Sequence, residues 1–111
     1  MSYTSRLKLP YIHSGQAQKE ITHNEALTLL DILINPVVEA TQVAMPPQDA
    51  MTGQLYIVSQ HPQGEFISHA NKIAQKLEVG WKFVTAPKWL EVILNSNGSK
   101  YRFDGNNWIK S

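Results

Sequence analysis

The stretch whose residue types could carry chemistry lies near the N-terminus, where residues 15–31 read GQAQKEITHNEALTLLD. Glu20, His23 and Glu25 are possible acid–base groups, because imidazole and carboxylate side chains one helical turn apart can move protons. The competing interpretation is structural. Thr22 followed three residues later by Glu25 matches a capping box, in which the two side chains accept hydrogen bonds from main-chain amides at a helix start. We favour the capping box and expect a helix to begin at Thr22.

The remaining ionisable residues do not form a known catalytic or metal-binding motif. The chain has no cysteine, and its four histidines lack the three-to-five-residue gaps of zinc-binding motifs: His13, His23, His61 and His69. No nucleophile elbow, phosphate-binding loop or dinucleotide fingerprint occurs. A glycan-cleaving enzyme would need two carboxylates at a suitable separation, which the sequence cannot establish from Glu65, Glu78, Glu91 and Asp104. We therefore expect no enzyme, no catalytic residue, no metal and no cofactor.

Aromatic residues gather near the C-terminus and offer a different chemistry, because flat rings beside polar groups stack on sugars. Trp89 follows Ala-Pro-Lys in an expected loop, so Trp89 and Lys88 are the best candidates for a ligand contact. The other aromatic residues of this region are more simply interpreted as the core of a small sheet: Trp81, Phe83, Tyr101, Phe103 and Trp108.

The elements that must position these residues differ between the two halves of the chain. Behind the cap, an apolar stripe recurs at helical spacing and consists of Ala26, Leu29, Leu30 and Leu33, widened by Leu27 and Ile34. Pro36 should end or kink the helix, because it lacks an amide proton. We expect residues 37–44, VVEATQVA, to continue as a kinked or second helix. Residues 1–48 would then form an N-terminal segment and helical arm.

From Leu55 the apolar residues alternate with a period of two, which is typical of strands. The runs LYIV, WKFV, EVIL and KYRF are separated by turn residues, and residues 91–110 predict two consecutive hairpins. We interpret residues 68–80 as strand and loop. The expected fold class is α+β, an N-terminal helical arm followed by a small antiparallel β-sheet domain built from hairpins over residues 49–111.

Composition narrows the function classes. Of the 111 residues, 42% are hydrophobic and 17% are charged, which is typical of a globular protein. The net charge of +1 is too small and too scattered for a nucleic-acid-binding surface. No apolar run is long enough to insert into a membrane, and the first residues lack a signal-peptide core. We therefore expect synthesis in the cytoplasm.

Self-association is predicted from the wide apolar stripe and from strand edges that a small sheet leaves unpaired. We expect a homo-oligomer, with a trimer favoured. The polar residues at the helix entry would fix its register, because a buried unpaired amide costs about 1–3 kcal/mol. This predicted assembly set consists of Gln16, Gln18, Lys19, Thr22, His23, Asn24 and Glu25.

The same stretch carries a family resemblance. LPYIHSGQAQKEITHNEALTLLD (9–31), MPPQDAMTGQLYIV (45–58), GWKFVTAPKW (80–89) and YRFDGNNW (101–108) follow one another in family order. Over residues 7–108 the chain resembles a phage-derived domain family of unknown function, found in prophages and gene transfer agents and often in tail-fibre-type proteins. The resemblance implies a virion-associated role beside other virion proteins, with the protein ending in a phage-like particle. The stretch GEFISHANK (64–72) departs from the family's usual pattern.

Two functions remain open at this point. The first is a phage-derived virion structural or tail-fibre-type adaptor that oligomerises and contributes to host-surface attachment. The second is a carbohydrate-binding module that recognises cell-envelope polysaccharide through exposed aromatic residues.

Overall fold

The computed structural model describes residues 3–12 and 19–111. The chain divides into two compact units, Met1–Ile34 and Asn35–Ser111. The division that the sequence predicted, at residue 48, lies inside the second unit, because the segment after Pro36 belongs to a β-sheet.

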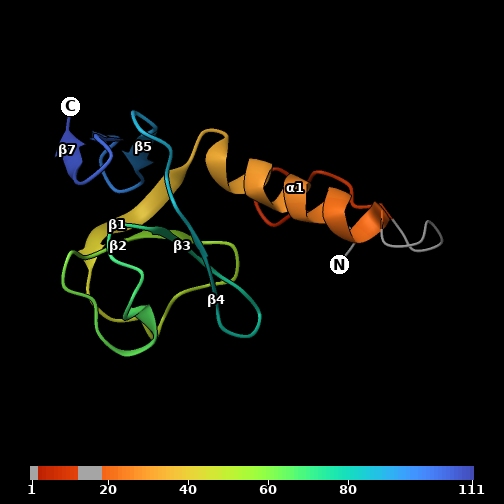
Figure 1. The fold of residues 1–111 in the computed structure, drawn as a ribbon, viewed down its shortest axis with the longest axis horizontal. Coiled ribbons are helices and arrows are strands. Elements are labelled where there is room, and N and C mark those ends of the chain that lie inside the picture. Colours follow the sequence, from red (N-terminus) through yellow and green to blue (C-terminus); the bar gives the residue numbers. More distant parts are fainter. Residues whose placement is uncertain (1–2, 13–18) are drawn as a thin grey trace. The chain divides into compact units, whose positions relative to one another are not determined.

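The first unit is built on helix α1 (Lys19–Leu33). The helix begins three residues before Thr22, so Thr22 and Glu25 lie within the helix and the predicted capping-box start is wrong. Residues 3–12 lie along α1 and fold back on themselves, with Tyr3 and Pro10 in an antiparallel bridge (Figure 1). The Tyr11 hydroxyl is 2.8 Å from Thr28 Oγ1, and Asn24 exchanges two hydrogen bonds of 2.9 Å with the main chain of Ile12.

Asp31 fastens the N-terminal segment to the end of α1. Its carboxylate is buried and accepts hydrogen bonds from the Thr4 hydroxyl (2.6 Å) and from the main-chain amides of Arg6 (2.9 Å) and Leu7 (2.6 Å). The Arg6 guanidinium also donates to the main-chain oxygens of Asp31 and Ile34. Asp31 is not part of the predicted apolar stripe, yet its side chain is buried. Burial is tolerated because the carboxylate has three donors.

The predicted apolar stripe is only partly covered. Leu29, Leu30 and Ile34 are 40%, 47% and 48% exposed, although the helical period assigned them to a buried face. No helix in the described ranges has the length and apolar character needed to cross a membrane.

The second unit is one mixed sheet of seven strands in the order β4-β3-β2-β1-β5-β6-β7. Its strands are β1 (Val37–Val43), β2 (Leu55–Val58), β3 (Ile73–Lys76), β4 (Trp81–Val84), β5 (Glu91–Leu94), β6 (Lys100–Phe103) and β7 (Trp108–Lys110). The predicted fold class is therefore wrong: the protein is mostly β, and its sheet is neither small nor purely antiparallel. The two predicted hairpins at residues 91–110 are confirmed as β5–β6 and β6–β7.

Strand β1 explains the error. Residues 37–44 were expected to be helical, but Pro36 stops α1 and the β-branched residues Val37, Val38 and Val43 favour an extended chain. β1 lies at the centre of the sheet, with Val38 in parallel register with Leu55 of β2 and with Leu94 of β5. Both partners are distant in sequence, so no hairpin signal marks this strand.

On either side of β1 the chain forms a three-stranded antiparallel meander of the same design. The first meander (β2–β4) ends with Lys76 opposite Trp81, and the second (β5–β7) ends with Phe103 opposite Trp108. In both, four loop residues precede the tryptophan that starts the last strand. The connections between the first two strands differ, since residues 59–72 join β2 to β3 while only residues 95–99 join β5 to β6.

The long connection of the first meander carries the 3-10 helix η1 (Gly64–Phe66), which delivers Phe66 into a core cluster with Val58 and Ala74. The fully buried Phe66 ring meets the Trp81 ring edge to face, with 5.0 Å between centroids, and the Phe83 ring at 5.7 Å. Phe66 thus covers the tryptophan of the first meander.

Candidate functional site

A cavity opens where the second meander separates from β1. The register between β1 and β5 ends at Val38, whose carbonyl oxygen accepts a hydrogen bond of 2.9 Å from the Asn95 amide. β1 continues to Val43 with only β2 in register beside it. The resulting space, which we call the wedge cavity, has a volume of about 190 Å³ and is lined by Thr41, Gln42, Ile57, Val58, Ser59, Gln60, His61, Asn71, Tyr101 and Trp108.

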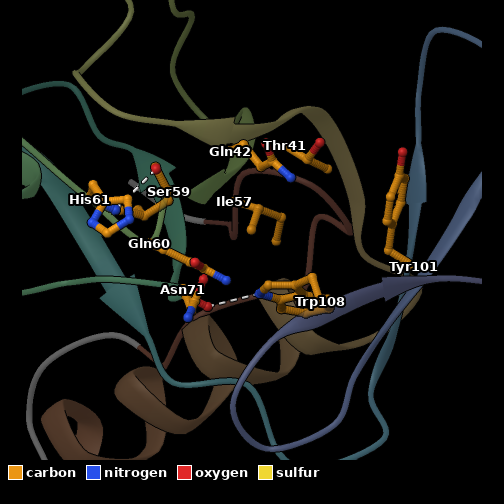
Figure 2. Close-up of a pocket in the computed structure, with 10 residues that line it drawn as sticks. Thr41, Gln42, Ile57, Ser59, Gln60, His61, Asn71, Tyr101 and Trp108 are labelled. Carbon is orange, nitrogen blue, oxygen red and sulfur yellow. Dashed lines mark hydrogen bonds between the residues drawn. The ribbon is translucent and has the colours of Figure 1, made fainter.

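The lining separates into a floor, two aromatic walls and a polar mouth. Ile57 and Val58 of β2 are buried and form the floor. Figure 2 shows Trp108 on one side of Ile57 and Gln42 on the other, with Tyr101 standing apart on β6. Gln42, Gln60 and His61 are exposed, so the amide and imidazole groups border the opening.

Three hydrogen bonds hold the two meanders together across the cavity. The Trp108 indole Nε1–H donates to the main-chain oxygen of Asn71 (2.9 Å), and the Asn71 side-chain amide donates to the main-chain oxygen of Asn106 (2.8 Å). The Gln60 amide donates to Asn107 Oδ1. The β6–β7 turn is therefore bonded to the β2–β3 connection, which keeps the cavity walls at a fixed separation.

The β6–β7 turn is itself ordered by Asp104. Its Oδ1 accepts from the amides of Asn107 (2.6 Å) and Asn106 (2.8 Å). These main-chain donors, the Asn107 amide first, lower the pKa of Asp104, and Lys88 adds to the effect. The turn thus presents Asn106 and Asn107 in a fixed position to the residues that they bind.

Two residues of the lining have a backbone conformation that side chains disfavour. Gln42 has φ +55° and Asn71 has φ +63°. Asparagine tolerates this left-handed region, whereas glutamine is uncommon there. Such local strain persists when the surrounding structure imposes it, and it gathers at binding sites. The β1–β2 register is also irregular here, because it shifts between Ala40 and Val43, the two paired residues on either side of Gln42.

Several polar groups of the lining have no hydrogen-bond partner among the described residues. Within residues 3–12 and 19–111, no hydrogen bond is formed by the Thr41 hydroxyl, the Gln42 amide, the His61 ring or the Tyr101 hydroxyl. The lining contains no lysine, arginine, aspartate or glutamate. The cavity therefore offers neutral donors and acceptors beside aromatic rings. Elsewhere in the described segments, no three histidine or carboxylate side chains come together as metal ligands.

The ligand contact that the sequence proposed lies outside this cavity. Trp89 is 53% exposed, with φ +72°, and its ring centroid lies 5.6 Å from Lys88 Nζ and 5.6 Å from Arg102 Cζ. Trp89 does not line the wedge cavity, because Arg102 and Tyr101 alternate on β6 and only Tyr101 lines it. The structure brings Trp89 and Lys88 together, and their role in ligand binding stays a prediction.

The predicted assembly residues all belong to the first unit. Gln16 and Gln18 fall outside the described residues, and Lys19 is the first residue of α1. Thr22, His23 and Glu25 are exposed, whereas Asn24 is bonded to Ile12. Asn24 thus fixes a junction within its own chain, and its part in assembly remains a prediction.

Sequence reasoning missed most of the cavity. The sequence predicts Tyr101 and Trp108 as core residues, whereas both are half-buried side chains that line the cavity. Gln42, Gln60 and Asn71 come from separate segments and form no motif, so the sequence does not mark them as site residues. The length of the β5–β6 turn is a usable sequence signal. A connection of this length is too short to bring a side chain over Trp108, as the longer β2–β3 connection brings Phe66 over Trp81.

The second unit thus combines a central strand with two parallel neighbours, two antiparallel meanders and a cavity with two aromatic residues in its lining. Residues 23–109 match the DUF2793 family, described as a protein of unknown function, and the chain belongs to this family. A comparison with curated proteins gave no match.

Proposed function

We propose that the protein is a non-catalytic attachment component of a phage-type particle, and that its second unit binds carbohydrate in the wedge cavity. The observation that carries the carbohydrate assignment is the lining of the cavity. Tyr101 and Trp108 supply aromatic rings, and the lining also holds hydroxyl and carboxamide groups but no lysine, arginine, aspartate or glutamate. Sugars present C–H faces to aromatic rings and hydroxyl groups to neutral donors and acceptors, so the lining fits this ligand class.

The phage-type assignment rests on the sequence stretches that resemble the prophage-associated family, above all residues 9–31. Host attachment connects the phage-type assignment with the carbohydrate assignment, because a particle that recognises a cell surface needs a module that binds the surface polysaccharide. Mass spectrometry of purified particles tests this part. The chain is expected among the particle proteins, and its exclusion from them would contradict the assignment.

Binding of the full chain to immobilised envelope glycans tests the carbohydrate assignment. Tyr101→Ala removes one wall of the cavity and should abolish binding, while Tyr3→Ala, at an exposed tyrosine of the first unit, should leave it unchanged. Trp89→Ala separates the two candidate surfaces. Binding that survives Tyr101→Ala and is lost in Trp89→Ala would move the site to the Trp89 surface. Failure to bind any glycan would exclude the carbohydrate function.

A second proposal concerns assembly. Leu29, Leu30 and Ile34 leave apolar surface in water at the end of α1, and burial against further copies of the chain would stabilise a homo-oligomer by roughly 25 cal/mol per Å². Light scattering over a dilution series should give three times the chain mass of 12.5 kDa for the favoured trimer. Leu30→Lys should dissociate it, whereas Val79→Lys, at a valine that is 90% exposed, should not. A monomer at all concentrations would contradict the proposal.

A further inference from the structure

The wedge cavity is small, and this limits what can enter. Its volume of about 190 Å³ lies below the roughly 300–1,000 Å³ of pockets for drug-sized ligands. One pyranose ring with its substituents is the largest carbohydrate unit that such a space encloses. The rest of a polysaccharide would extend past the polar mouth.

Trp108 of the second meander corresponds in position to a tryptophan of the first meander. Trp81 occupies the equivalent position, after a four-residue loop, and the Phe66 ring covers it at 5.0 Å. The five-residue β5–β6 turn brings no such side chain to Trp108, whose ring contact with another aromatic is with its own cross-strand neighbour Phe103 at 5.0 Å. Among the described residues, no ring like that of Phe66 covers Trp108, and a ligand with an apolar ring face can take that place.

The side-chain amides of the lining form hydrogen bonds through some of their atoms and leave other donors and acceptors free for a ligand. The amide nitrogens of Gln60 and Asn71 donate to Asn107 and Asn106, which leaves their side-chain oxygens as acceptors. Neither end of the Gln42 amide has a partner in the described part of the chain. The mouth thus combines free acceptors on the β2–β3 side with a free donor and acceptor on β1, and the apolar floor residue Ile57 lies between Gln42 and Trp108 (Figure 2).

Resting on the proposed function, we infer that the cavity takes a single uncharged N-acetylated hexopyranose. An acetamido group has one N–H donor, one carbonyl acceptor and one methyl group. Its N–H matches the free oxygens of Gln60 or Asn71, its carbonyl matches the Gln42 amide N–H, and its methyl group matches Ile57. A sugar carboxylate would lose hydration in the cavity and meet no lysine or arginine, because the lining holds neither.

Titrations with methyl glycosides that differ in one substituent test this inference. The probes are the N-acetylglucosaminide, the glucoside and the glucuronide, with the same three in the galactose series to cover both configurations. The N-acetylated sugar should bind about tenfold more tightly than the parent hexoside, as two added hydrogen bonds predict, and the uronide should bind more weakly than both. The Trp108 indole N–H resonance reports occupancy directly.

Two glycine variants at left-handed positions separate recognition from folding. Gln42→Gly removes the amide and suits φ +55°, so the fold should be retained while the preference for the N-acetylated sugar is lost. Ser68→Gly is the matched control, because Ser68 has φ +73° and lies outside the cavity; it should keep the preference.

The outcomes distinguish this inference from the proposed function. Equal affinity for the acetamido and parent sugars, or tighter binding of the uronide, would overturn the inference and leave carbohydrate binding standing. Binding to immobilised glycans without binding to any of the six glycosides would do the same. Failure to bind both the glycosides and the immobilised glycans would overturn the inference together with the proposed function.

Discussion

The indole nitrogen of Trp108 donates a hydrogen bond of 2.9 Å to the main-chain oxygen of Asn71. The two residues belong to different meanders and both line the wedge cavity. This bond closes one side of the opening that begins where β5 leaves β1, so it links the stability of the sheet to the shape of the cavity.

Replacing Trp108 with phenylalanine should therefore destabilise the second unit. The substitution keeps an aromatic ring but leaves the Asn71 carbonyl without its donor, which costs about 1–3 kcal/mol in free energy of unfolding. Urea denaturation followed by circular dichroism measures the change. Trp89→Phe is the control, because Trp89 is exposed, and it should change the free energy by less than about 0.5 kcal/mol. Equal effects of the two variants would show that the Trp108 bond is not responsible.

Asp31→Asn should loosen the N-terminal segment. The new amide presents a donor to at least one of the three groups that now donate to Asp31, the Thr4 hydroxyl and the amides of Arg6 and Leu7. We expect a loss of roughly 1–3 kcal/mol in local stability. Hydrogen exchange checks this residue by residue, with faster exchange at Arg6 and Leu7 and unchanged protection in the sheet. Unchanged protection at both amides would contradict the role given to Asp31.

Stability should fall in mild acid because of His69. Its ring stacks on Phe83, with 3.7 Å between centroids and 3° between planes, and burial followed by the charge of Lys72 lowers its pKa from 6.5. The unfolded chain then takes up a proton at a higher pH than the folded chain. The free energy of unfolding therefore decreases as the pH falls below about 6.5.

Urea denaturation of the native chain and of His69→Phe at several pH values between 8 and 5 isolates this contribution. His69→Phe should flatten the pH dependence below 6.5, and Lys72→Gln should reduce it, since Lys72 is the second cause of the shift. A slope that His69→Phe leaves unaltered would rule out His69 as its source.

Phe66→Ala should be the most damaging of these substitutions. The ring is fully buried against Trp81 and Phe83, and loss of a buried phenylalanine costs about 3–5 kcal/mol. Thermal unfolding should show a large drop in midpoint. Phe66→Leu keeps most of the volume and should cost much less. A small loss in Phe66→Ala would mean that η1 can be removed without disturbing the first meander.

Elements whose sequence signals lie within the element itself, such as turns and alternating strands, could be predicted. The turn residues around Gly98 and Gly105, together with alternation in KYRF, predicted the β5–β6–β7 hairpins that the structure contains. Strand β1 was mistaken for helix, because its identity depends on pairing of Val38 with Leu55 and Leu94. Nothing within residues 37–44 encodes those partners.

The wedge cavity was beyond prediction for a related reason. Its lining comes from β1, the end of β2, the β2–β3 connection and the last two strands, and these segments meet only in the folded sheet. An exposed tryptophan can be proposed from its sequence neighbours, as Trp89 was. The left-handed conformation of Gln42 has no sequence signal at all, since glutamine rarely adopts it.

The two meanders also differ in how freely their side chains can be replaced during evolution. Phe66 and its neighbours hold the first meander together, so their replacement is opposed by loss of stability. Tyr101, Trp108 and the β5–β6 turn lie in the second meander, where side chains can change without disturbing the cluster around Phe66. Under the proposed function, substitutions at Tyr101 or Trp108 would alter the ligand preference, while the first meander, which also supplies Val58 to the cavity floor, would keep the cluster around Phe66.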